Sequence, residues 1–130
     1  MSAVEGKMEE FLPTIRCGFY YPDRWVSPYL GVDFALPTGQ PVLEFAVFNP
    51  KNAEFLGASF LVRLGLIALY RSAPMQPDTY QRHSIELPAM HEAATISISF
   101  RSSVRWRAPD PDERVLGLVL PLLYCSVRSG

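Results

Sequence analysis

The sequence predicts an all-β domain, an antiparallel β-sandwich of jelly-roll type with about eight strands. Three observations predict it. The apolar segments are short, proline and glycine recur between them, and one late segment alternates between apolar and polar residues. Among 130 residues, 12 are prolines, a share that argues against long helices. The length fits a single domain, which we expect to span residues 13–130, with residues 1–12 loose or forming a short helix.

The first half of the chain contains three expected strands separated by turns. Thr14–Tyr21 is the first, and Leu30–Leu36, in which alternate residues are apolar, is the second. The turn Pro37–Pro41 leads into the third strand, Val42–Phe48. A further turn follows, and we expect one short helical turn at Ala53–Leu56.

The second half contains longer apolar segments. Ser59–Tyr70 includes Gly65, which favours a bulge or bend over a helix interior. Residues 95–107 alternate, with apolar residues on one side and serines and arginines on the other. Val115–Tyr124 is apolar on both sides, which predicts a central strand. Pro121 within it indicates instead an edge position or a bulge.

Charge and targeting patterns exclude several classes of protein. Twelve basic and 13 acidic residues give a net charge of -1, so no basic excess favours nucleic acid as a partner. The longest apolar run, Val115–Cys125, is far shorter than the roughly 20 residues that a membrane-spanning helix requires. The N-terminal segment lacks the pattern of a secretory signal, so we expect a cytoplasmic protein with Cys17 and Cys125 as reduced, buried thiols.

The motifs of common catalytic sites are absent from the sequence. It contains no glycine-rich phosphate loop, no Cys-x-x-Cys pair, no His-Glu-x-x-His and no Gly-x-Ser-x-Gly. We therefore expect no enzyme, no cofactor and no metal. Asp33 and Glu44 fall on the polar sides of their strands, as solvated carboxylates do. The acids of Asp110–Glu113 could hold calcium, but a turn whose acids accept backbone N–H bonds is the commoner arrangement.

Two groups of residues are candidates for ligand binding. Residues 18–29 hold five aromatic side chains, a density found at binding surfaces, and from this segment we select Tyr21, Arg24, Trp25 and Tyr29. The alternative is that Phe19 and Trp25 plug one end of the sandwich. The second group is the row Arg101, Arg105 and Arg107, whose guanidinium groups could bind an anionic ligand or simply lie on a solvated face beside acidic residues.

Two motifs near the ends of the chain carry a resemblance. Gly-Phe-Tyr-x-Pro-Asp-Arg-Trp at 18–25 resembles the opening of a small β-sandwich domain attached to bacterial glycosyltransferases. The segment Asp110–Leu120 is similar to the closing motif of that domain, with the added residues Asp112, Glu113 and Val115. The resemblance implies an accessory rather than a catalytic domain. It also implies that Arg24, Trp25, Asp110 and Arg114 are key positions, with an Arg–Asp contact tying the opening loop to the closing turn.

The function expected from these patterns is a non-catalytic accessory or carbohydrate-binding module linked to bacterial glycan or surface-polysaccharide synthesis. Its partner would be a saccharide or a glycosyltransferase. The alternative is a protein-interaction or homo-oligomerisation domain that uses the apolar segment Phe60–Tyr70 or a sheet edge.

Overall fold

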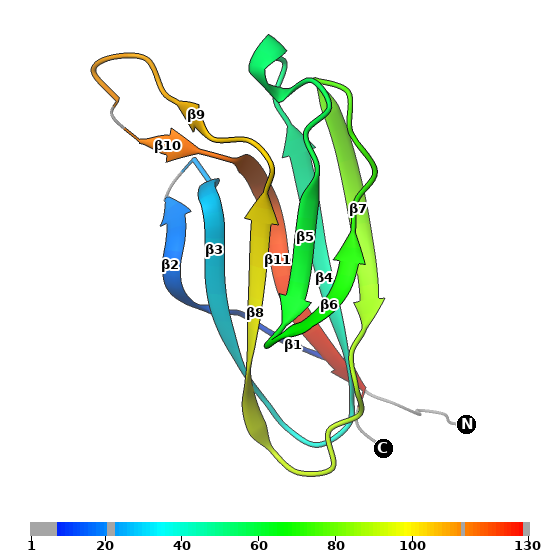
Figure 1. Ribbon diagram of the computed structural model, residues 1–130. Coiled ribbons are helices and arrows are strands. Elements are labelled where there is room, and N and C mark those ends of the chain that lie inside the picture. Colours follow the sequence, from blue (N-terminus) through cyan, green and yellow to red (C-terminus); the bar gives the residue numbers. More distant parts are fainter. Residues whose placement is uncertain (1–7, 21–22, 113, 129–130) are drawn as a thin grey trace.

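A computed structural model describes residues 8–20, 23–112 and 114–128, and within them the fold is an antiparallel β-sandwich of eleven strands (Figure 1). The all-β prediction is confirmed, with more strands than the expected eight or so. The strands are β1 (Met8–Phe11), β2 (Thr14–Tyr20), β3 (Trp25–Leu36), β4 (Gln40–Asn49), β5 (Phe60–Leu64), β6 (Ile67–Arg71), β7 (Thr79–Glu86), β8 (Ala94–Ser102), β9 (Trp106–Arg107), β10 (Val115–Leu116) and β11 (Leu118–Arg128). The expected helical turn is a 3₁₀ helix at Ala53–Phe55.

Nine of the eleven strands in the described residues form two layers joined by β3, and β9 and β10 pair with each other as a separate two-stranded sheet. One layer, which we call the β8 layer, has the order β2-β3-β8-β5-β6. The other, the β11 layer, has the order β1-β11-β4-β7. The layers connect where Trp25 and Val26 at the start of β3 pair with Val119 and Leu118 of β11. Figure 1 shows β11 and β4 lying behind β8 and β5.

Alternate residues of the long strands fill the space between the layers. Leu30, Val32 and Phe34 of β3 are fully buried, as period-2 alternation requires of an inward face. Phe45 of β4 meets them from the opposite layer and makes an edge-on contact with Phe100 of β8, with ring centroids 5.1 Å apart. Each such buried side chain contributes roughly 1.5–3 kcal/mol of transfer free energy.

The later strands have the local features that their sequence predicts. Ser59–Tyr70 forms the hairpin of β5 and β6, which bends at Gly65, a residue with φ of 57°. The last long strand is central, because β11 pairs with β1, β3 and β4. Pro121 is exposed at an irregularity between Val119 and Leu122, so the bulge is confirmed and the edge position is not.

Two expectations about the N-terminal part need correction. Met8–Phe11 is a strand rather than a helix, because it pairs with the free edge of β11 and satisfies its backbone groups. Residues 1–7 lie outside the described residues. Cys17 is exposed rather than buried, since β2 is an outer strand whose register shifts on both sides of this residue.

Cys125 is buried as expected, and neither it nor Cys17 forms a disulfide. Burial raises the pKa of the Cys125 thiol to about 12, which keeps it protonated and unreactive. Over the described ranges, none of the helical structure has the length and apolar character needed to cross a lipid bilayer.

Two glycines of the opening and closing motifs lie where the backbone of another strand comes close. A Cβ at Gly18, whose φ is 89°, would collide with the Tyr29 carbonyl oxygen. A Cβ at Gly117 would lie 2.9 Å from the Ser102 Cβ and 3.0 Å from the Pro28 Cα. Glycine is required at these positions by close packing of β2, β8 and the β10–β11 junction on β3.

We expect Gly18→Ala to lower the free energy of unfolding by about 3 kcal/mol or more, because it combines backbone strain with a steric clash. Gly57→Ala is the matched control: its φ is 76°, but the space around it is open. That substitution costs about 1 kcal/mol from backbone strain alone. Urea unfolding of both variants measures the difference, and equal losses would contradict the role of close packing at Gly18.

Aromatic side chains connect β6 and β7, which are the edge strands of the two layers on the same side of the sandwich. The His83 ring lies 4.9 Å from the Tyr70 ring and stacks on Phe45 at 5.1 Å. A ring nitrogen of His83 hydrogen-bonds the Gln81 Oε1 at 3.0 Å. Burial lowers the pKa of His83 below its usual 6.5, because the charged form is poorly solvated there.

The lowered pKa of His83 makes stability depend on pH. Above about pH 6.5 the imidazole is neutral in both the folded and unfolded states. As pH falls below that value the unfolded chain binds the proton more readily, so stability decreases until the folded pKa is passed. We expect the melting temperature to fall between pH 7.5 and about pH 5. His83→Phe should flatten that dependence, whereas His91→Gln at an exposed position should not.

Candidate functional site

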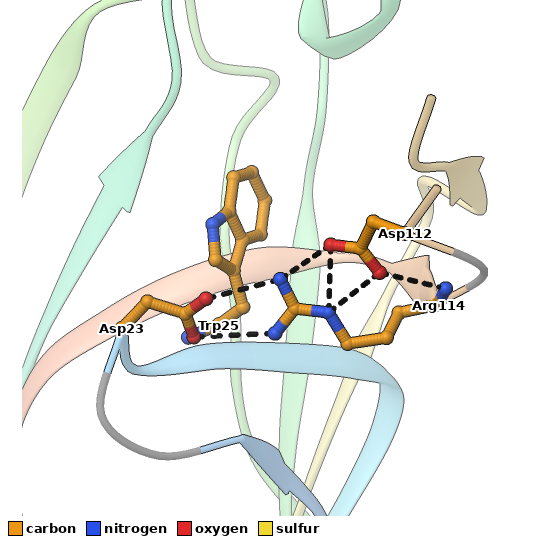
Figure 2. Close-up of polar contacts among 4 residues, drawn as sticks. All are labelled: Asp23, Trp25, Asp112 and Arg114. Atoms are coloured by element: carbon orange, nitrogen blue, oxygen red, sulfur yellow. Dashed lines mark hydrogen bonds and ion pairs between the residues drawn. The ribbon is translucent and has the colours of Figure 1, made fainter. Parts of the chain in front are cut away.

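Arg114 ties the opening loop of the chain to the closing turn (Figure 2). Its two terminal nitrogens donate to the two carboxylate oxygens of Asp23, at 3.3 and 3.0 Å. Its Nε donates to both oxygens of Asp112 at 2.9 Å, and Nη2 lies 2.6 Å from the same carboxylate. The guanidinium also lies over the Tyr20 ring, 5.0 Å from its centroid. We call Asp23, Asp112 and Arg114 the Arg114 clamp.

The Arg114 clamp has the kind of contact expected between the two motifs, but one residue differs. Asp112 takes the place expected for Asp110, which is exposed in the turn and makes no ion pair with a described residue. Asp112 is favoured because its carboxylate also accepts the Arg114 backbone N–H at 3.0 Å, which closes the turn. Arg114 lowers the pKa of both Asp23 and Asp112, because it stabilises their charged forms.

Trp25 and Arg24, both selected as ligand-binding residues, make structural contacts. The Trp25 ring packs 5.9 Å from Phe55 and 5.8 Å from Trp106, so it covers one end of the core. The Arg24 Nε donates to the Leu120 carbonyl at 2.8 Å, and its guanidinium lies over the Phe19 ring. These contacts fit the alternative in which the opening aromatics plug the end of the sandwich. Tyr21 lies outside the described residues.

The structure also bears on the calcium alternative at the closing turn. Asp112 is engaged by Arg114, and Glu113 lies outside the described residues. The part of the chain that the structure describes contains no cluster of three or more His, Cys, Asp or Glu side chains placed to hold a metal ion.

Three of the selected residues gather elsewhere, on the outer face of the β8 layer. Tyr29 of β3 pairs directly with Arg101 of β8, and the Arg101 guanidinium lies 5.7 Å from the Tyr29 ring centroid. Arg105 follows the end of β8 and lines the same hollow of about 430 Å³, together with Pro28 and Ser103. Arg107 does not line it, because the chain turns after Ser102 and Arg107 pairs with Val115.

Two further hollows flank this one and share residues with it. Tyr29 also lines a hollow of about 320 Å³ with Arg16, Leu66, Ser97 and Ser99. Arg101 and Ser103 also line a hollow of about 140 Å³, which Arg71 of β6 borders. We call these three hollows the outer groove. Tyr29, whose side chain is 40% exposed, stands between the two larger ones.

Arg16 and Arg71 belong to this surface and were not selected from the sequence. Arg16 donates to the Asp33 carboxylate at 2.8 Å, and Ser97 donates to the same oxygen. Contacts with Asp33 and Tyr29 raise the pKa of Arg16, so it remains charged. Both arginines reach this surface because strands that are distant in sequence pair with each other. The alternation of residues within one segment does not predict such pairing.

Comparisons with known proteins support the fold. No protein-family model and no curated protein matches this sequence. Among solved structures, dimeric latent PorU from Porphyromonas gingivalis is similar, with a TM-score of 0.55 and 11% identity over 98% of this chain and 13% of that one. The ANX1 ectodomain from Arabidopsis thaliana gives a TM-score of 0.50 and 9% identity over 100% of this chain and 40% of that one.

A carbohydrate-binding module from Cellvibrio mixtus lichenase 5A also aligns, with a TM-score of 0.40 and 13% identity over 95% of this chain and 91% of the module. That score is too low to carry an argument about function. The chain spans less than half the length of PorU and of the ANX1 ectodomain, so these likenesses show a shared β-sandwich architecture and nothing about activity.

We expect Arg114→Lys to lower the melting temperature by a few degrees, because a lysine ammonium cannot bridge two carboxylates as the planar guanidinium does. Without the guanidinium fork, the pKa values of Asp23 and Asp112 rise toward those of the unfolded chain. In the unmodified chain, Asp23 and Asp112 stabilise the fold above about pH 4, and this stabilisation is lost as the pH falls through their lowered pKa values. In the Arg114→Lys variant, this pH-dependent stabilisation is smaller.

Thermal melting from neutral pH to about pH 3 tests this expectation. Arg107→Lys, on an exposed residue of β9 outside the Arg114 clamp, is the control and should melt like the unmodified chain. If the melting temperature of the Arg114→Lys variant fell with decreasing pH as it does in the unmodified chain, the Arg114 clamp would not stabilise the loops.

Proposed function

We propose that this chain is a non-catalytic carbohydrate-binding module whose saccharide lies in the outer groove against Tyr29. The observation that carries the proposal is the position of the Tyr29 ring. It is substantially exposed on the surface of a sheet, and it borders two hollows of about 320 and 430 Å³. An aromatic ring with free area, beside hollows that present both polar and apolar groups, suits a ligand that is apolar on one face and hydroxylated around its rim.

The residues around Tyr29 supply the polar contacts that a sugar requires. Ser97 and Ser99 lie in one hollow and Ser103 in the next. The Ser97 hydroxyl donates to Asp33 and keeps acceptor capacity, whereas the Ser103 oxygen accepts the Ser59 N–H and keeps its hydroxyl hydrogen as a donor. Arg16 and Arg101 flank the ring and add only donors. A rigid sheet holds all of these groups, so little conformational entropy is lost when a ligand binds.

The arrangement of carboxylates supports a binding rather than a hydrolytic role. Asp33 is engaged by Arg16 and Ser97. Glu44 is on β4 in the other layer and accepts a hydrogen bond from Ser84. A glycoside hydrolase needs two carboxylates facing each other across the bound sugar, and these two belong to different layers.

The wider role that we propose is accessory to bacterial glycan or surface-polysaccharide synthesis, next to a glycosyltransferase in the cytoplasm. Support for this part comes from the motifs at 18–25 and 110–120, which resemble those of a glycosyltransferase-associated domain. The Arg114 clamp gives these motifs a shared physical purpose, since it joins their loops.

A protein-interaction domain is the second candidate, and one observation favours it. At the turn between β5 and β6, Leu66 is 95% exposed and Ile67 is 62% exposed. Adjacent exposed aliphatic side chains are a common feature of docking surfaces. Sizing chromatography of the unmodified chain and of Leu66→Ser distinguishes this candidate, because self-association through the hairpin requires an oligomer that the substitution dissociates.

A glycan array tests the proposed carbohydrate-binding function. We expect Tyr29→Ala to weaken binding of the best saccharide about tenfold, since loss of one aromatic contact costs on the order of 1.4 kcal/mol. Tyr80→Ala is the matched control, because Tyr80 is exposed on β7 in the other layer. If no saccharide bound the unmodified chain, or if both variants bound equally well, a sugar site at Tyr29 would be refuted.

A further inference from the structure

Three arginines of the outer groove, unlike Arg16, are not neutralised by a carboxylate within the described residues. Arg71, Arg101 and Arg105 are exposed, and none of them forms an ion pair with any residue in the described ranges. Asp33, the one acidic residue of β3 and β8, is already bound by Arg16 and Ser97. Because the whole chain carries a net charge of -1, this local excess of positive charge is a property of the surface and not of the composition.

Strand register places two of these arginines in line across the sheet. Tyr29 of β3 pairs with Arg101 of β8, Arg101 pairs with Leu61 of β5, and Leu61 pairs with Arg71 of β6. Neighbouring strands are about 4.8 Å apart, so the backbones of Arg101 and Arg71 are separated by roughly 10 Å. A ligand that crosses the strands from Tyr29 therefore meets an aromatic ring first and then two guanidinium groups in succession.

The guanidinium groups of Arg101 and Arg71 favour anionic groups on the ligand. A guanidinium binds a carboxylate or sulfate through two parallel hydrogen bonds, which are stronger than bonds between neutral groups. Arg105 borders the same hollow as Arg101, so two donors converge there from β8 and the segment that follows it. The remaining lining combines serines with apolar side chains, namely Ser59, Ser102 and Ser103 with Pro28, Tyr29, Phe60 and Leu61. The arginines therefore lie beside the exposed Tyr29 ring, on which a sugar ring can stack, and this favours a sugar chain over the side chains of an acidic peptide.

We propose that the outer groove binds an acidic polysaccharide, with its carboxylate or sulfate groups on Arg101 and Arg105 and the next anionic group toward Arg71. This inference rests on the proposed carbohydrate-binding function and names its ligand class. Tyr29 supports a sugar ring, and the arginines select chains with regularly spaced negative charge. Neutral glucans lack the anions that make the arginine contacts strong.

Binding measurements with four soluble polymers test the inference. The polymers are polygalacturonate for carboxylates, carrageenan for sulfates, laminarin as a neutral glucan and polyglutamate as an acidic peptide. We expect one of the two acidic polysaccharides to bind at least about tenfold more tightly than laminarin and polyglutamate, and to weaken as salt is added. Whichever of the two binds identifies the anionic group.

The double variant Arg101→Gln/Arg105→Gln should lose about tenfold or more of that affinity, whereas Arg107→Gln, outside the groove, should keep it. Melting curves establish that the variants are folded. Laminarin binding that depends on Tyr29 but not on the arginines would overturn the acidic ligand and leave the carbohydrate function standing. Polyglutamate binding as tight as that of the polysaccharides would overturn it in favour of an acidic peptide. Binding of neither acidic polysaccharide would refute the acidic ligand, and the carbohydrate function would fall as well only if no saccharide on the glycan array bound.

Discussion

The fold depends on hydrogen bonding of one strand to three others. β3 pairs with β11 at Trp25 and Val26, with β8 from Tyr29 to Leu36, and with β2 along its other edge. The same strand therefore begins in contact with one layer and continues in the other. This change separates Trp25, whose ring packs into the end of the core, from Tyr29, whose ring lies on the outer surface. Two aromatic residues of one short motif thereby acquire different roles.

Most of the layer architecture could be predicted, because a strand with one buried face has apolar residues at every second position. The inward residues of β8 alternate with polar ones, and the large apolar residues within Leu30–Leu36 of β3 alternate with Gly31, Asp33 and Ala35. The central position of β11 follows from its apolar character on both sides. The pairing of β1 with β11 left no such signal, since it joins opposite ends of the chain. Ser102 interrupts the apolar side of the alternating segment 95–107. Its buried hydroxyl bonds the Gly117 carbonyl and the Val104 N–H, and the strand ends there.

The candidate site could be predicted only in part, for the same reason. Tyr29, Arg101 and Arg105 were selected from local density and alternation, and the structure brings them together. Arg71 reaches the groove through the β5–β6 hairpin, and one sequence alone does not fix the register of distant strands. Arg24 and Trp25 belong to an aromatic-rich motif, but motif density does not distinguish a side chain that packs inward from one that meets a ligand.

The place of β11 in the sheet also constrains how the chain folds. This last strand pairs with β1, β3 and β4, and Met8 is paired with Arg128 across nearly the whole sequence. During synthesis, the β11 layer lacks its centre until residues 118–128 leave the ribosome, and β1 and β4 have no strand between them. Chains dominated by such distant pairings fold slowly, in milliseconds to seconds. Unpaired edges of β1 and β4 are then exposed to other chains until the final strand is inserted.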